Sequence, residues 1–217
     1  TRLMGALIMS HSDDNGLVLP PFLAPTQVIL IPVIKSKENS EQIVEKSNEI
    51  YANLKDMGVR VKIDDRENIS LGFKLNDSEV KGIPMRIVIG LNEIENNSAD
   101  IFYRHNMSKV HISFDNIVDK IFDSIESIQD NMINLSNEKL KNNTHEVDSY
   151  DDFKKLIESQ SGFVIAGWDG TKETEEAIKN ETKATIRCIP ENIDSKGVTC
   201  IYSGKPAAHK VIFSKSY

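Results

Sequence analysis

The 217-residue chain is 39% hydrophobic and 27% charged, the balance of an ordinary globular protein, which excludes a disordered chain. Its apolar stretches are shorter than the roughly 18–20 residues of a membrane span, so no membrane partner is expected. The net charge of −7 disfavours a general nucleic-acid binder, but a local site can still read a few bases. Two cysteines are too few for a disulfide scaffold, which favours a cytoplasmic location.

The chain opens on an almost continuous apolar stretch. Residues Leu3–Met9 predict a strand buried on both faces, and Ser12–Gly16 is a turn signal. The Asp13-Asp14 pair favours that turn over an acid–base pair. A short strand over Leu17–Leu19 is expected before Pro20-Pro21 stops regular structure. Because no turn or cap precedes the first strand, we expect the chain to begin inside a larger fold.

From Thr26 to Phe114 strands and helices alternate, which predicts a small α/β domain with parallel pairing and helical cover. Helices are expected at Glu41–Met57, with Ser40 as N-cap, and at Leu71–Lys81. The expected strands are Val28–Ile34, Val59–Ile63, Met85–Ile89, Ile101–Arg104 and Val110–Phe114.

The second half of the chain begins with a long helical pattern over Asp115–Leu140. The polar residues that follow predict a linker, which we place at 134–147. A further α/β unit comes next, with helices expected at Asp151–Ser159 and Lys172–Thr182. Its expected strands are Gly162–Trp168, Thr185–Ile189, Gly197–Tyr202 and Lys210–Ser214.

The residues alone offer little catalytic chemistry. The sequence contains no P-loop, dinucleotide fingerprint or locally spaced Ser/His/Asp set, and its five histidines are too scattered to indicate a metal site. Arg2 begins an apolar stretch, so its guanidinium either pairs with a buried carboxylate or faces an anionic ligand. The sequence leaves these two readings of Arg2 open.

Residues 1–9 and 11–21 resemble motif 3 of prolyl-tRNA synthetases of the archaeal and eukaryotic-like type, and the segment that follows it. The continuation Gly16–Pro21 is the most specific part, although Ser12 stands where the family usually has glycine. The resemblance implies the end of a class II antiparallel catalytic sheet, in which Arg2 binds ATP. Such an arginine stacks on adenine or pairs with phosphate.

A second resemblance, to the family's anticodon-binding domain, covers residues 59–66, 70–76 and 79–90. Leu71, Phe73 and Leu75 replace the usual Pro, Trp and Phe, and they keep bulk and apolarity. Charged side chains and an aromatic ring suit the readout of unstacked bases. The plainer alternative is that Asp65 and Arg66 brace a loop and Phe73 fills the core. The candidate anticodon contacts are Arg66, Phe73, Lys74, Glu79, Lys81 and Arg86.

A third resemblance, to the family's C-terminal domain, covers residues 167–190, 200–207 and 213–217. Many members hold a structural zinc ion with four cysteines there, at positions occupied here by Asp169, Thr174, Cys200 and Ser203. One thiol remains and hydroxyls are poor zinc ligands, so no zinc is expected. The terminal Tyr217 matches the tyrosine that the family directs toward its catalytic domain, and a free tail is the alternative.

The resemblance thus implies a proline–tRNA ligase that uses ATP with Mg²⁺, binds proline and tRNA(Pro), and forms a homodimer through the missing catalytic domain. Its domains are expected at 1–25 (end of the catalytic domain), 26–133 (anticodon-binding) and 148–217 (C-terminal). The isolated fragment is expected to be inactive because motifs 1 and 2 are absent. Two alternatives stay open, a non-catalytic tRNA-binding paralogue and a protein-assembly module.

Overall fold

The computed structural model describes residues 1–34, 40–159 and 162–215. The chain divides into two compact units, Thr1–Ile133 and Asn134–Tyr217. In the described part of the chain, no helix is both long and apolar enough to cross a membrane.

The first unit is built on a five-stranded sheet with the strand order β4-β3-β5-β6-β7. Strands β3 (Val28–Pro32), β4 (Val61–Ile63) and β5 (Met85–Ile89) are parallel, whereas β6 (Ser98–Tyr103) and β7 (Ser108–Ser113) continue the sheet antiparallel. The central strand β3 is buried on both faces, as an uninterrupted apolar run in a parallel sheet should be.

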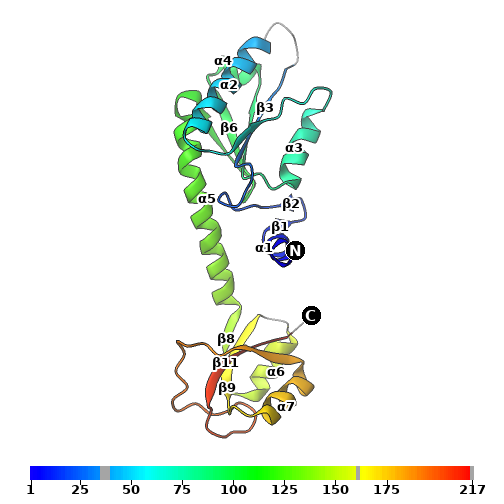
Figure 1. Ribbon diagram of the computed structural model, residues 1–217, viewed down its shortest axis with the longest axis vertical. Coiled ribbons are helices and arrows are strands. Elements are labelled where there is room, and N and C mark those ends of the chain that lie inside the picture. Colours follow the sequence, from blue (N-terminus) through cyan, green and yellow to red (C-terminus); the bar gives the residue numbers. More distant parts are fainter. Residues whose placement is uncertain (35–39, 160–161, 216–217) are drawn as a thin grey trace. The chain divides into compact units, whose positions relative to one another are not determined.

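Helices cover the two faces of this sheet. One face packs against α2 (Ser40–Asp56) and α5 (Phe114–Asn142), and α3 (Leu71–Val80) lies on the opposite side (Figure 1). A short helix, α4 (Leu91–Glu95), joins β5 to β6. The core combines alternate strand residues with the apolar stripes of α2 and α5, including Val28, Leu30, Ile50, Ile87, Ile117 and Ile121.

The predicted strands and helices between Thr26 and Phe114 are confirmed, with ends that move by a few residues. Ser40 is the first helical residue of α2, so the N-cap position lies outside the described residues. Val44 on α2 is apolar but 41% exposed. On α5, Phe122 and Leu135 are likewise exposed although they share the helical period.

The expected strand at Leu3–Met9 is wrong, because these residues form helix α1 (Arg2–Ser10). A continuous apolar run is compatible with either structure, and periodicity cannot separate them. Among the described residues no strand pairs with this segment and none of its residues is buried, and the helix pairs its backbone groups internally. The turn that follows is confirmed as a hairpin of β1 (Ser12–Asp13) and β2 (Gly16–Leu17).

The segment expected to be a linker, 134–147, is not irregular. Helix α5 continues to Asn142, and β8 (Thr144–Glu146) follows almost at once. Lysine, glutamate and asparagine are typical of a solvated linker, but they are equally compatible with an exposed helix, where they need no buried partner. Polarity therefore marked exposure here, not the absence of secondary structure.

The second unit has a four-stranded sheet with the order β10-β11-β9-β8. It comprises β8, β9 (Phe163–Trp168), β10 (Ala184–Cys188) and β11 (His209–Lys215), with helices α6 (Tyr150–Glu158) and α7 (Lys172–Thr182). Its core contains Phe153, Ile157, Val164, Ile178, Val211 and Phe213.

The strand expected at Gly197–Tyr202 is wrong. This segment forms a turn in which Cys200 N–H donates to the Lys205 carbonyl and Gly204 N–H donates to the Cys200 carbonyl. A single bridge joins Thr199 to Pro206. Ile201 N–H reaches the Gly167 carbonyl on β9, but Cys200 pairs within the loop, so the segment does not continue as a strand of the sheet.

Candidate functional site

The sequence-predicted anticodon residues all lie on or beside helix α3. The helix begins after Ser70, whose side chain accepts a hydrogen bond from Phe73 N–H and caps the first turn. Strand β5 follows directly and carries Arg86 beneath the helix. The loop from Asp64 to Ser70 precedes α3, and we name it the 64–70 loop. The structure thus brings these residues together.

Arg66 is held in place by two carboxylates. Its Nε and Nη2 donate to Asp64 at 2.8 and 2.7 Å, and Nη2 also donates to Asp77 on α3 at 2.8 Å. Hydrogen bonding to Arg66 lowers the pKa of Asp64 below its usual range, and bonding to Lys81 above all lowers that of Asp77. The ion pairs fix the guanidinium plane while 43% of the side chain stays exposed.

Phe73 is 54% exposed on the first turns of α3, so the alternative that it fills the core is wrong. The Arg66 guanidinium carbon lies 5.9 Å from the centre of the Phe73 ring. A cationic plane and an aromatic ring therefore share one exposed patch. Both surfaces can stack on a nucleobase.

Two of the predicted residues are buried beneath this patch. Lys74 Nζ donates to the Asp64 carbonyl at 2.8 Å, and 7% of Lys74 is exposed. Arg86 Nη1 donates to the Leu75 carbonyl, the Ser78 hydroxyl and the Glu79 carboxylate, and its guanidinium lies 4.2 Å from the Phe102 ring centre. These cations support α3 and the loop from within, and Glu79 is the acceptor that holds Arg86.

Lys81 lies just after α3 and is 60% exposed at its side chain. Its Nζ donates to Asp77 at 2.8 Å, so Asp77 receives both Lys81 and Arg66. The surrounding charge is therefore balanced locally, although the exposed lysine can still reach a phosphate.

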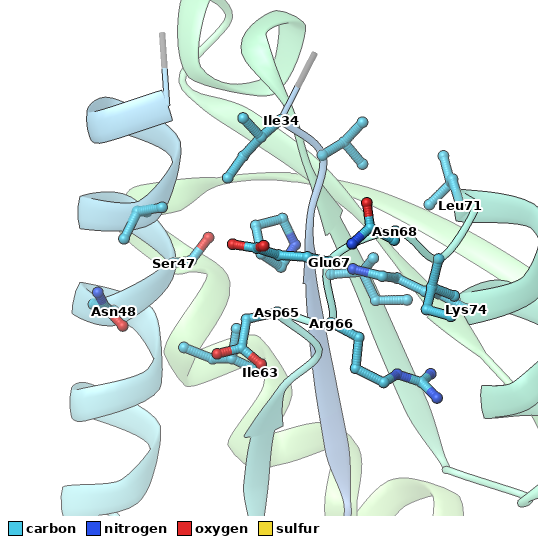
Figure 2. A pocket seen from close by; sticks show the side chains of 15 residues that line it. Ile34, Ser47, Asn48, Ile63, Asp65, Arg66, Glu67, Asn68, Leu71 and Lys74 are labelled. Carbon is cyan, nitrogen blue, oxygen red and sulfur yellow. The ribbon is translucent and has the colours of Figure 1, made fainter. Parts of the chain in front are cut away.

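A groove of about 710 Å³ opens beside this patch, between α2 and α3. We name it the α2–α3 groove. It lies at the carboxyl ends of β3 and β4, the edge at which parallel sheets usually bind ligands. Figure 2 shows the Asp65 and Glu67 carboxylates on the α2 side of the 64–70 loop, whereas the Arg66 guanidinium points toward α3. The groove thus offers acceptors on one wall and an apolar floor from Ile31, Ile34 and Ile63.

A second hollow, of about 570 Å³, lies on the other side of Arg66. Its lining combines Leu17 and Leu19 with Lys62 on β4 and with Asp77 and Lys81. Strand β2 of the hairpin and the segment after it therefore form part of the wall beside the candidate site.

Sequence reasoning missed the carboxylates that organise the site. Asp64 contacts both Arg66 and Lys74, and Asp77 joins the loop to the end of α3. The i,i+4 spacing of Asp77 and Lys81 was a usable signal. The burial of Asp64, 5% exposed, could not be read from a polar loop sequence.

The residue expected to bind ATP, Arg2, lies exposed in the first turn of α1. One exposed cation is insufficient to define an ATP site. Within the described ranges, no group of three or more His, Cys, Asp and Glu side chains could hold a metal ion.

The four positions matched to zinc ligands do come together. Asp169 Oδ2 accepts from the hydroxyls of Thr174 at 2.9 Å and Ser203 at 2.7 Å. Ser203 N–H in turn donates to Cys200 Sγ at 3.5 Å. Asp169 Oδ1 accepts from Thr171 N–H and Oγ1, so both carboxylate oxygens are already used.

Burial alone would raise the pKa of Asp169, but hydrogen bonds from Ser203, Thr171 and Thr174 outweigh it and lower the pKa to about 2. One thiol, two hydroxyls and a saturated carboxylate do not fit a zinc ion. The cluster instead joins the start of α7 to the 200–204 turn through hydrogen bonds. The remaining candidate, Tyr217, lies outside the described residues.

Comparisons with known proteins match both units. The family model described as "Anticodon binding domain" matches residues 27–123. The one described as "Prolyl-tRNA synthetase, C-terminal" matches residues 150–217. The candidate site on α3 lies within the first of these matches.

Proline–tRNA ligases of Phocaeicola vulgatus and Bacteroides fragilis are 47% and 48% identical to this chain over its whole length. The chain spans 44% of each relative. A crystal structure of prolyl-tRNA synthetase from Cryptosporidium parvum, complexed with L-proline and AMP, has a TM-score of 0.91 and 36% identity. The match to this crystal structure covers 100% of the present chain and 46% of the chain in the crystal structure. The chain belongs to the prolyl-tRNA synthetase family.

Proposed function

We propose that this chain supplies motif 3 and the anticodon-binding and C-terminal domains of a proline–tRNA ligase. The ligase activates proline with ATP to prolyl-adenylate and transfers it to tRNA(Pro). The domain extents that we assign are 1–25, 26–133 and 148–217. The observation that carries the proposal is the exposed Phe73–Arg66 patch beside the α2–α3 groove, within a matched anticodon-binding domain.

The six candidate residues divide into two roles by burial. Arg66, Phe73 and Lys81 are exposed and contact the anticodon loop, through stacking, base edges and phosphate. Lys74, Glu79 and Arg86 are engaged inside the unit and position α3. The three exposed residues therefore contribute affinity for tRNA, and the three buried or engaged residues hold α3 in the position that exposes them.

The groove supplies the specificity of the proposed site. Unstacked bases present donors and acceptors on their edges, and Asp65 and Glu67 line the groove with exposed carboxylates. Neither carboxylate forms an ion pair within residues 1–34, 40–159 and 162–215, so each can accept from a base. A flipped base would rest on the apolar floor while its edge meets these acceptors.

The sites for ATP, Mg²⁺ and proline lie mainly in the part of the ligase that this chain does not cover. ATP supplies the adenylyl group that activates the amino-acid carboxylate. Arg2 would contact this nucleotide, as its match to motif 3 implies, and no further step is assigned to this chain. Tyr217 would dock toward the catalytic domain. We also propose a homodimer formed through that domain, and a cytoplasmic location.

Titration of this chain with tRNA carrying the proline anticodon, and with the same tRNA mutated in its anticodon, tests the proposal. We expect the first to bind more tightly than the second, with an affinity that falls as salt rises because phosphates are neutralised. Fluorescence anisotropy at two salt concentrations measures both effects.

An equal affinity for the two tRNAs would contradict the proposed reading of the anticodon. An assembly module would ignore the anticodon, whereas a non-catalytic tRNA-binding paralogue would distinguish the tRNAs without supporting aminoacylation. Aminoacylation by the full-length protein separates that paralogue from the ligase.

A further inference from the structure

The hairpin β1–β2 is seated on the end of helix α3 by a buried arginine. Arg104, which follows β6, is 1% exposed. Its Nη1 and Nη2 donate to the two carboxylate oxygens of Asp13 at 2.8 and 2.5 Å. Its Nε donates to the Glu79 carbonyl near the end of α3 at 3.2 Å. One guanidinium therefore connects the hairpin to the helix.

Close backbone packing reinforces this connection. Gly16 has a φ of +135°, and a side chain there would collide with the backbone of Val80. Gly82 has a φ of +66°, and a Cβ on it would lie 2.6 Å from the Leu17 Cβ. Leu19 N–H donates to the Gly82 carbonyl at 3.3 Å. Movement of the end of α3 therefore displaces the hairpin.

The hairpin is in turn continuous with α1. Ser12 Oγ donates to the Ile8 carbonyl at 2.6 Å, His11 N–H to the Leu7 carbonyl, and Val18 N–H to the His11 carbonyl. The segment Thr1–Leu19 is thus linked by hydrogen bonds from α1 to the contact with α3. This segment is the one that resembles motif 3.

The arginine on the neighbouring strand binds the same stretch of helix. Arg86 holds the Leu75 carbonyl, the Ser78 hydroxyl and the Glu79 carboxylate, while Arg104 holds the Glu79 carbonyl. Glu79 therefore receives one arginine at its side chain and the other at its backbone. A shift of α3 would therefore change the geometry at Glu79, and the hydrogen bonds of Arg104 connect that residue to Asp13.

We propose that Asp13 and Arg104 are positioning residues that couple helix α3 to the segment Thr1–Leu19. This inference rests on the proposed function, because it requires tRNA to bind on α3. Anticodon binding would then tighten the hairpin and, through α1, the edge of the catalytic site. Neither residue touches the RNA or the reacting atoms in this scheme.

Hydrogen exchange of this chain with and without an anticodon stem-loop of the proline tRNA tests the coupling. We expect the RNA to slow exchange in residues 11–19 of the unmodified chain by about fivefold or more, in the range of typical coupling between sites. In Asp13→Asn/Arg104→Met the slowing should be confined to α3 and the 64–70 loop. Asp14→Asn is the matched control, because Asp14 is exposed and belongs to no ion pair between described residues.

The double variant separates coupling from stability. Asp13→Asn alone leaves a buried guanidinium without its counter-charge, whereas Arg104→Met removes that charge and keeps comparable bulk. The double variant should therefore fold and bind RNA while the coupling is lost. Unchanged slowing in residues 11–19 of the double variant would overturn the inference. If the unmodified chain shows no anticodon-dependent protection of α3, the proposed function itself fails.

Kinetics of the full-length ligase give a second readout. The double variant should lower kcat for aminoacylation of tRNA(Pro) by about fivefold or more, with proline-dependent pyrophosphate exchange without tRNA unchanged. If Asp13 and Arg104 only stabilised the fold, the double variant would lower the rates of aminoacylation and of pyrophosphate exchange together. That result would contradict the inference. Asp14→Asn should leave both rates as they are.

Discussion

At the scale of single residues, burial separates side chains that the sequence presents as equivalent. Lys74, Lys81, Arg66 and Arg86 all look like available cations near a helix. In the structure Lys74 and Arg86 are engaged internally, and Arg66 and Lys81 remain accessible. A buried charge needs a partner because desolvation is costly, and the fold provides one for each.

Phe73→Ala should weaken binding of the proline-tRNA anticodon stem-loop by about 1–3 kcal/mol, the typical contribution of one stacked base. The chain should keep its stability, because Phe73 is 54% exposed and its removal leaves no cavity. Anisotropy titration and thermal unfolding measure the two quantities. Phe122→Ala is the matched control, since Phe122 is 43% exposed on α5. Equal affinities for the two variants would count against a stacking role.

At the scale of elements, two glycines allow β1–β2 to approach the end of α3. Both Gly16 and Gly82 have positive φ and lack space for a Cβ. The turn residues were recognisable in the sequence, but their close contact was not, because it depends on how distant segments pack. The same limit explains the wrong strand at Leu3–Met9, where tertiary partners decide between helix and strand.

Gly82→Ala should destabilise the first unit more than Gly58→Ala. Both residues have left-handed backbones, which costs alanine about 1–2 kcal/mol. A Cβ at Gly58 meets nothing within 4 Å, whereas one at Gly82 meets Leu17 at 2.6 Å. Hydrogen exchange of the core strands reports the difference in unfolding free energy. An equal decrease in unfolding free energy for Gly82→Ala and Gly58→Ala would show that the hairpin can move away from Gly82 without loss of stability.

At the scale of the whole molecule, the two units are stabilised by different kinds of interaction. The first unit buries its apolar residues between a five-stranded sheet and two helices. The second has a smaller core, and Asp169 joins its loops by hydrogen bonds to the hydroxyls of Thr174 and Ser203. Charged acceptors strengthen such bonds, which makes Asp169 the residue on which these loops depend.

Asp169→Asn should destabilise the second unit by about 1.5–3 kcal/mol, the usual contribution of a hydrogen bond to a charged group. The chain has a single tryptophan, Trp168, which is the last residue of β9 and directly precedes Asp169. Tryptophan fluorescence during denaturant unfolding therefore reports the unfolding of the second unit. A zinc chelator should not change the denaturant concentration at which half of the unmodified chain is unfolded. A chelator-dependent midpoint would contradict the expectation that no zinc is bound.

The contribution of Asp169 should depend on pH in a defined direction. Its folded pKa of about 2 lies below the roughly 3.9 of an unfolded aspartate, so the contribution is complete above about pH 4. It is lost as the pH falls toward 2. The free energy of unfolding, followed by Trp168 fluorescence, differs between the unmodified chain and Asp169→Asn. This difference should become smaller as the pH falls from about 4 toward 2. A constant difference from pH 6 to pH 2.5 would contradict this assignment.

The 217-residue chain alone should not catalyse proline-dependent pyrophosphate exchange. Within its described ranges, Arg2 is the residue assigned to ATP, and no carboxylate group suited to a metal ion is formed. Addition of tRNA should not restore the reaction. Exchange above background, in a preparation that shows anticodon-dependent binding, would place a complete activation site within this chain.

The amino-acid sequence by itself determined the five strands and the two longer helices from Thr26 to Phe114, because periods of 2 and 3.6 residues follow from local geometry. The short helix α4 was not predicted. The sequence also carried the resemblance to prolyl-tRNA synthetases, which the comparisons confirm. The tertiary structure alone decided which cations are buried, and it paired Asp13 with Arg104 across 91 positions. Such pairs depend on where the folded chain returns upon itself, and no local pattern encodes that.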